Sequence, residues 1–357
     1  ATRADERPSP DAQLSTGHPR ASPGAAAEGR RMSAHKRRRR DQEHGIDIED
    51  IAADPRPGMT APCNIHFSAD DSMIGYLLSK PGSRDQVLIV NTVDESGAVS
   101  SATPFVRQDF VHSDEETLSL EERLRRERTR SWGQGVTSFA WGSTTNIAVL
   151  QINGGVYVQR GIHGPLCQLV EADVDTDADL ELEARAGRAQ AGQGQGPVLD
   201  PKLSPDESAL AFVRGAEVHV VRIDAGGEAA GPPVPVTTGA SEELCVSHGL
   251  ADFCAQEEMQ RYDGYWWSPN SEFIAFQETN ESAVPEFTIV HHRETAALAR
   301  EVHRYPFTGG ANPRVRLGVT PAFPGGRRPE PPVWLDLGIE GPSAQQGANG
   351  LSREGAG

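Results

Sequence analysis

The sequence lacks the short motifs that mark many enzymes. It contains no G-x-S-x-G nucleophile elbow, no H-E-x-x-H zinc motif and no G-x-x-x-x-G-K-[ST] phosphate loop. It also has no run of about 18 apolar residues and no charged-then-apolar leader, the signals of membrane spans and secretory peptides. We therefore predict no catalytic residue in this sequence and no membrane partner.

Cysteine is scarce and not arranged for metal binding or dense cross-linking. The four cysteines, at positions 63, 167, 245 and 254, include no C-x-x-C pair. His291, His292 and His303 have no metal-ligand spacing either. The sequence predicts reduced thiols in an intracellular protein, no metal site and no cofactor.

Hydrophobic residues make up only 37% of the chain, whereas 37 glycines and 26 prolines favour loops and turns over long helices. The net charge is −17 and is unevenly distributed. The first 40 residues carry ten Lys/Arg against four Asp/Glu, a net of about +6, which leaves about −23 for the rest. An acidic body argues against a nucleic-acid partner and suits a cationic ligand.

Two low-complexity tails flank the remaining sequence. Residues 1–57 and 338–357 are rich in small and polar residues and are predicted to be disordered, because they cannot bury enough apolar surface. The run Lys36–Arg40 fits a nuclear address or an anion-binding patch, or simply a solvated basic tail. The expected location is the cytoplasm, with the nucleus as the alternative.

Between the tails, one pattern of strand, polar turn and strand occurs four times. The turns begin at positions 68, 142, 204 and 268, which lie 74, 62 and 64 residues apart. Repetition of a four-stranded unit is typical of a β-propeller, and the long period indicates insertions within the blades. The sequence predicts an all-β, partial β-propeller of about four to five blades over residues 58–337, in which the strand-like runs after Pro285 form a further blade. A β-sandwich is the alternative, but it would not be expected to repeat the same turn.

One insertion, residues 119–130, reads SLEERLRRERTR and predicts a helix. Ser119 and Glu122 form a capping box, and Glu121 precedes Arg125 by one turn. Most of its faces are charged, so packing alone does not explain it. A solvated surface helix is the alternative to a binding role.

The stretch 249–285 is the densest in acids and aromatics together. Glu257 and Glu258 are adjacent, and Tyr265, Trp266 and Trp267 follow. Neighbouring side chains diverge on a helix or strand, so both acids meet one ligand only on a short or bent helix. Two carboxylates can then share the three N–H donors of a primary ammonium. The alternatives are solvated acids and aromatic core anchors.

This stretch resembles the double-glutamate region of the dipeptidyl peptidase IV family, nearest to its bacterial and cytosolic 8/9-type branches. The resemblance rests on residues 252–253, 256–258, 261–262 and 264–269, with 280–282, 305–306 and 309–313 as later landmarks. It covers residues 63–337. It implies an N-terminal propeller that caps an α/β-hydrolase domain in a serine exopeptidase releasing N-terminal dipeptides.

The resemblance assigns Glu257 and Glu258 to the α-amine of a peptide substrate. An arginine of the 119–130 helix, Arg126 or a neighbour such as Arg128, would also hold the substrate. The family's serine, aspartate and histidine lie in a hydrolase domain that this sequence lacks, so we expect a truncated product that is inactive alone. Peptide N-termini and that domain are the expected partners, and a homodimer is left open for a full-length form. The alternative is a non-catalytic propeller that serves as a protein-interaction module.

Overall fold

The structure is a computed structural model that describes residues 48, 51, 60–79, 83–106, 133–172, 197–241, 243–290, 300–325 and 329–338. Contacts divide the chain into two units, Ala1–Ala53 and Asp54–Gly357, and every strand belongs to the second. The basic run Lys36–Arg40, the helix expected at residues 119–130 and almost all of the two expected tails lie outside the described residues.

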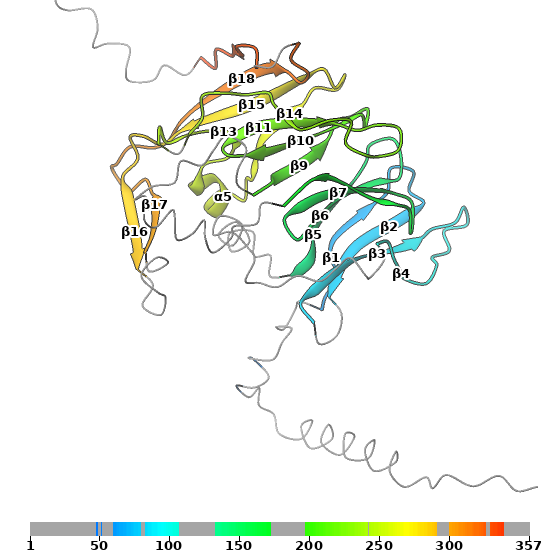
Figure 1. Cartoon of the computed structure of the whole chain (residues 1–357). Coiled ribbons are helices and arrows are strands. Elements are labelled where there is room, and N and C mark those ends of the chain that lie inside the picture. The colour runs from blue at the N-terminus through cyan, green and yellow to red at the C-terminus, as the bar shows by residue number, and fades with distance from the viewer. Residues whose placement is uncertain are drawn as a thin grey trace, which may run out of the picture. The chain divides into compact units, whose positions relative to one another are not determined.

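The second unit is built from four consecutive groups of antiparallel strands (Figure 1). A short parallel pairing of residues 85–86 with residues 134–135 joins the first two groups into one sheet. The first contains β1 (Cys63–Phe67), β2 (Met73–Ser79), β3 (Asp85–Thr92) and β4 (Thr103–Pro104). The second contains β5 (Gln134–Trp141), β6 (Ile147–Ile152), β7 (Gly155–Arg160) and β8 (Leu166–Val170). The third contains β9 (Leu199–Leu203), β10 (Ala209–Arg214), β11 (Glu217–Arg222) and β12 (Val234–Pro235). The fourth contains β13 (Val246–Leu250), β14 (Asp263–Trp267), β15 (Phe273–Asn280), β18 (Arg314–Pro321) and β19 (Val333–Trp334).

The predicted strand–turn–strand pattern is confirmed at all four positions, where each turn joins β1 to β2, β5 to β6, β9 to β10 or β14 to β15. The chemistry of the turn is visible at Ser204. Its hydroxyl donates to Asp206 Oδ1 at 2.6 Å and accepts from the backbone N–H of Ala209 at 3.0 Å. The same two kinds of bond form at Ser68 and Ser268. A short polar side chain thus accepts a hydrogen bond from a backbone N–H group where the chain reverses direction. This role explains why the motif recurs.

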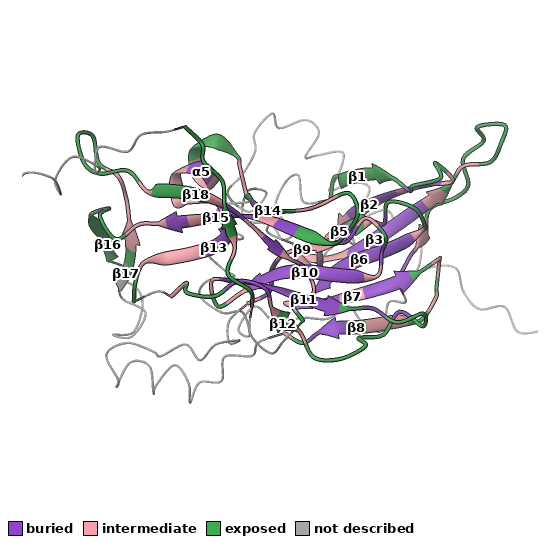
Figure 2. Ribbon diagram, turned by 90° about the horizontal axis from the view of Figure 1, so that it is seen from above, coloured by how far each residue is buried: buried purple, intermediate pink, exposed green. Residues whose placement is uncertain are grey.

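Three apolar clusters form the core, and each lies between two consecutive sheets. The first packs Leu88 of β3 with Leu150 of β6, the second packs Val156 of β7 with Phe212 of β10, and the third includes Phe276 of β15. Figure 2 shows buried residues along the inner strands β6 and β10, while β1 is exposed. Each sheet therefore needs its neighbour to cover it, which identifies the fold as a partial β-propeller of four blades.

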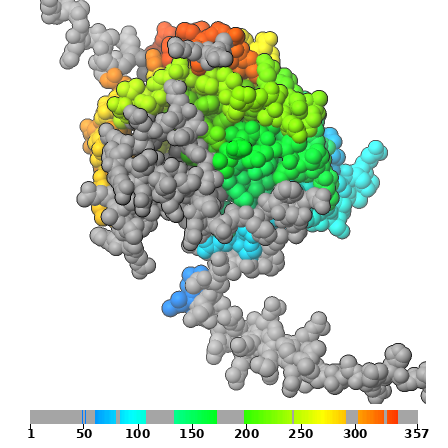
Figure 3. All heavy atoms as spheres, viewed as in Figure 1, coloured from blue at the N-terminus to red at the C-terminus, as the bar shows by residue number. Residues whose placement is uncertain are grey.

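The strands after Pro285, expected to form a further blade, instead complete the fourth. β18 pairs with β15 along eight residues, and β19 pairs with β18. The intervening β16 (Glu286–Val290) and β17 (Arg300–Arg304) pair only with each other and form an inserted hairpin. In Figure 3 the segments near residues 100 and 320 lie on opposite sides of the visible face of the second unit.

Hydrogen bonds between the turns link neighbouring blades. Asn146 Nδ2 donates to Asp70 Oδ2 at 2.9 Å, which joins the second blade to the first. The backbone N–H of Thr145 donates to Glu207 Oε1 at 2.9 Å, which joins the second to the third. The backbone N–H of Asp206 donates to Ser271 Oγ at 3.1 Å, which joins the third to the fourth. The turn motif thus holds blades together as well as reversing the chain.

Candidate functional site

The double glutamate lies on α5 (Phe253–Met259), a seven-residue helix between β13 and β14. Asp252 caps its start, and the Asp252 carboxylate accepts from the backbone N–H of Ala255 at 3.0 Å. Gln260 ends the helix in the left-handed conformation, with φ of 53°. The short helix expected for these acids is therefore present, and both of its ends are defined.

Glu257 and Glu258 occupy the last turn of α5, where Glu257 is half-buried and Glu258 is exposed. That turn holds no basic residue, and the first turn holds no acidic one. Carboxylates near a helix C-terminus face the partial negative charge of its carbonyl groups, so this placement weakens the helix. The same placement favours a cationic ligand.

The surroundings of α5 are acidic, as the thiol of Cys254 reports. Burial is the main cause of the raised pKa of Cys254, and the nearby charges of Asp252, Glu258 and Glu281 raise this pKa further. These carboxylates come from the start of the helix, its last turn and the segment after β15.

Arg261 ties both ends of α5 to the fourth blade. Its Nη2 lies 3.6 Å from Asp252 Oδ2, and its backbone N–H donates to the Ala255 carbonyl at 3.0 Å. Its Nη1 donates to Gln277 Oε1 at 2.8 Å and to the Asp263 carbonyl at 3.2 Å. One residue therefore contacts the N-cap, the helix carbonyls and the strands β14 and β15.

The aromatic cluster serves mainly as core. Tyr265 is fully buried, and its hydroxyl donates to the carbonyls of Asp200 and Ala211 in the third blade. Trp267 Nε1 donates to the Lys202 carbonyl at 3.1 Å, also across the blade boundary. Trp266, by contrast, is 42% exposed. Tyr265 and Trp267 thus fix β14, which follows α5, against the neighbouring blade.

Two of the later landmarks of the resemblance, Glu281 and Tyr305, lie near α5. The ring of Phe253 lies 5.7 Å from that of His303 and 6.1 Å from that of Tyr305. The backbone N–H of Glu281 donates to the Cys245 carbonyl just ahead of β13 at 2.8 Å. The fold therefore brings residues 245–261, 281 and 303–305 to one region. Arg126, the third predicted substrate-binding residue, and Arg128 lie outside the described residues.

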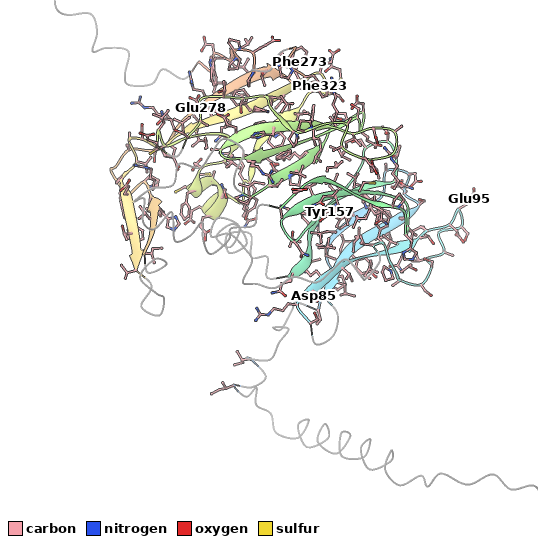
Figure 4. The ribbon with its side chains drawn as sticks, in the orientation of Figure 1. Asp85, Glu95, Tyr157, Phe273, Glu278 and Phe323 are labelled. Carbon is pink, nitrogen blue, oxygen red and sulfur yellow. The ribbon has the colours of Figure 1, made fainter. Side chains whose placement is uncertain are left out.

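Sequence reasoning missed a buried charge cluster around His248 on β13. Its Nδ1 lies 2.8 Å from Glu217 Oε2, and its Nε2 lies 3.1 Å from Glu278 Oε2. Arg316 donates to both oxygens of Glu278, each at 2.7 Å (Figure 4). Burial alone would lower the pKa of His248. The two carboxylates outweigh the effect of burial, so the pKa of His248 lies above its ordinary value. Burial raises the pKa of Glu278, and its bonds to Arg316 and His248 more than reverse that effect.

Two further observations limit the chemistry of the described residues. Within them, no helix is long and apolar enough to cross a membrane. Nor do three or more His, Cys, Asp or Glu side chains in the described ranges come close enough to hold a metal ion. The four cysteines are all free thiols.

Comparison with known proteins finds one family that resembles part of this chain. The family described as "Dipeptidyl peptidase IV (DPP IV) N-terminal region" matches residues 175–334. Human dipeptidyl peptidase 8 is 29% identical over 216 residues, which cover 57% of this chain and 22% of that protein. Inactive dipeptidyl peptidase 10 of Rattus norvegicus is 39% identical over 85 residues, or 23% of this chain and 10% of that protein. This chain therefore spans about a fifth or less of either relative.

A solved structure supports the same fold. Dipeptidyl peptidase 4 of Porphyromonas gingivalis superposes with a TM-score of 0.50 at 19% identity, covering 83% of this chain and 35% of that one. The family match over residues 175–334 includes α5, all of the third and fourth blades and the later landmarks. Residues 175–334 of this chain thus resemble the N-terminal region of the dipeptidyl peptidase IV family, and the chain folds as a partial β-propeller.

Proposed function

We propose that this chain binds the free α-ammonium group of a peptide through Glu257 and Glu258, as the propeller portion of a dipeptidyl peptidase IV-like serine exopeptidase. The observation that carries the proposal is the position of the two carboxylates in the last turn of a short, clamped helix in acidic surroundings. A helix-terminal acid pair costs folding stability, and an incoming ammonium offsets that cost.

The chemistry of the ligand follows from the donor count. A protonated α-amine presents three N–H donors, and two carboxylates can accept them together. Each charge-assisted hydrogen bond contributes about 1.5–3 kcal/mol. An acetylated N-terminus has neither the charge nor the donors, so the pair selects peptides with a free amine. Binding the amine at a fixed point would set the length of the fragment that is removed.

Cleavage itself belongs, in this proposal, to an α/β-hydrolase domain that the given sequence does not include. The sequence has no G-x-S-x-G elbow, and the relatives are several times longer than the matched part. Arg126 is proposed to hold the substrate together with the glutamates. Its placement rests on the family resemblance alone.

The test is a calorimetric titration of the chain with the peptide Ala-Pro-Ala and with its N-acetylated form. We expect the free-amine peptide to bind and the acetylated one to bind at least tenfold more weakly, since one lost charge-assisted bond accounts for about that factor. The chain alone should release no Gly-Pro or Ala-Pro dipeptide. Equal binding of both peptides would favour a general protein-interaction module instead.

A further inference from the structure

We propose that Arg261 is a positioning residue for the double glutamate, a role that rests on the proposed binding of an amine at Glu257 and Glu258. Its contacts fix the direction in which the last turn of α5 points. The residue lies outside the helix and is no part of the acid pair, so it acts through the helix.

The helix needs such a clamp because it is too short to hold itself. Isolated helices below about 12–15 residues are marginal in water. α5 has seven residues, and Ala255 is its one buried residue. Apart from the aromatic contacts of Phe253, hydrophobic packing along the helix is therefore slight, and polar contacts at its two ends help to set its orientation.

Arg261 supplies contacts at both ends. The guanidinium pairs with Asp252, the residue that caps the first turn, at 3.6 Å. The backbone N–H of Arg261 donates to the carbonyl of Ala255, one turn further on. The first contact holds the start of the helix, and the second closes the turn that carries Glu257 and Glu258.

The other partner of the guanidinium is a rigid strand. Gln277 is 4% exposed, and its Nε2 donates to Thr279 Oγ1 at 2.8 Å. Its strand, β15, is paired with β14 on one side and β18 on the other. The 2.8 Å bond from Arg261 to Gln277 thus anchors α5 to the best-supported strand of the fourth blade. The planar fork of arginine presents separate nitrogens to Asp252 and Gln277, a fixed geometry that the compact ammonium of lysine does not reproduce.

The experiment uses the full chain and two measurements. The first is the ratio of affinities for Ala-Pro-Ala and its N-acetylated form. The second is amide hydrogen exchange in residues 253–259, which reports how often α5 opens. The variants are Arg261→Gln, Arg261→Lys and Asp252→Asn, which keeps a good capping oxygen but removes the charge. Arg314→Gln is the matched control, because Arg314 is an exposed arginine on β18 of the same blade.

We expect Arg261→Gln to speed exchange in α5 and to lower the affinity ratio about tenfold or more. Arg261→Lys and Asp252→Asn should change the exchange rate and the affinity ratio in the same directions but by less. Arg314→Gln should change neither measurement. Unfolding of the chain would weaken the binding of both peptides alike. A changed affinity ratio therefore indicates a loss of positioning and not a loss of the fold. The lysine and asparagine variants keep the test usable if the glutamine variant does not fold.

Two results would overturn the proposal. One is an unchanged exchange rate in α5, and the other is faster exchange with an unchanged affinity ratio. If the unmodified chain does not distinguish the two peptides, the proposed function fails by itself. The exchange measurement then decides whether Arg261 positions the helix.

Discussion

His248 Nδ1 lies 2.8 Å from Glu217 Oε2, across the boundary between the third and fourth blades. The opposite ring nitrogen lies 3.1 Å from Glu278 Oε2, and Arg316 pairs with Glu278 in turn. The ring of Phe276 lies 5.1 Å away and closes the remaining side. This charged cluster joins the third and fourth blades in addition to their apolar packing and the hydrogen bond between their turns.

The first prediction concerns the pH dependence of this cluster. The pKa of His248 is raised in the folded state, because Glu217 and Glu278 outweigh the effect of burial. Its charged form therefore stabilises the fold fully below the ordinary pKa of about 6.5, and this stability is lost as the pH rises through the raised pKa. We expect the thermal midpoint to fall over that window.

Replacing the histidine should remove this dependence. His248→Leu removes the cationic partner that Glu217 and Glu278 share, although Arg316 still pairs with Glu278, and is expected to cost about 3–5 kcal/mol. The control is His66→Gln, which removes an exposed imidazole on β1. Circular dichroism melts between pH 5 and pH 9 measure both variants. An unchanged pH slope in His248→Leu would contradict the assignment.

The second prediction concerns acid stability at the turn between the second and third blades. Burial raises the pKa of Glu207, but its bonds to the hydroxyl of Thr145 and to the backbone N–H groups of Thr144 and Thr145 lower it overall. Its stabilising effect is therefore present above the ordinary pKa of about 4.3 and is lost as the pH falls through the lowered value.

Glu207→Gln should lower the unfolding free energy at pH 7 by about 1–3 kcal/mol, because it weakens the charge-assisted bonds that the buried carboxylate accepts from Thr144 and Thr145. The unfolding free energy of this variant should also fall less steeply below pH 5. Glu95→Gln, on an exposed loop, is the control (Figure 4). Urea titrations at pH 4 and pH 7 measure both changes. Equal effects of the two substitutions would refute the role of Glu207.

The third prediction compares the stability that two tyrosine hydroxyls contribute, one bonded across a blade boundary and one bonded within a blade. Tyr265→Phe removes the hydroxyl that reaches Asp200 and Ala211, leaving two carbonyls of the third blade without that donor. The expected cost is about 1–3 kcal/mol. Tyr76→Phe removes a half-buried hydroxyl bound to Asn91 within one blade, so it should cost less. Denaturant melts that show no difference would argue against a structural role for the Tyr265 hydroxyl.

Local sequence features predicted much of the fold. The four polar turns and the apolar runs beside them predicted eight strands, because the donors and acceptors of each turn lie within six residues. The strand β13 was missed, since Ser247, His248 and Gly249 carry little β propensity. The hairpin β16–β17 was assigned to a further blade, because pairing partners cannot be read from propensity alone.

Long-range polar contacts were beyond sequence reasoning. Glu207 meets Thr145 from 62 residues away, and His248 meets Glu217 from 31 residues away. Nothing in the local pattern links these positions. The adjacency of Glu257 and Glu258 did predict a short helix, because only that geometry lets neighbouring acids meet one ligand. Arg261 was noted as part of the resemblance, but its contacts with Asp252 and Gln277 emerged only from the fold.

The central claim is that Glu257 and Glu258 together bind a free α-amine. The most direct measurement is the affinity ratio for Ala-Pro-Ala over its N-acetylated form, compared between the unmodified chain and Glu257→Gln/Glu258→Gln. The control is Glu95→Gln/Glu243→Gln, which removes the same charge from exposed positions. We predict a ratio of about ten or more in the unmodified chain and the control, and a ratio near one in the double-glutamate variant. A ratio near one in the unmodified chain, or a preference that survives in the variant, would contradict the account.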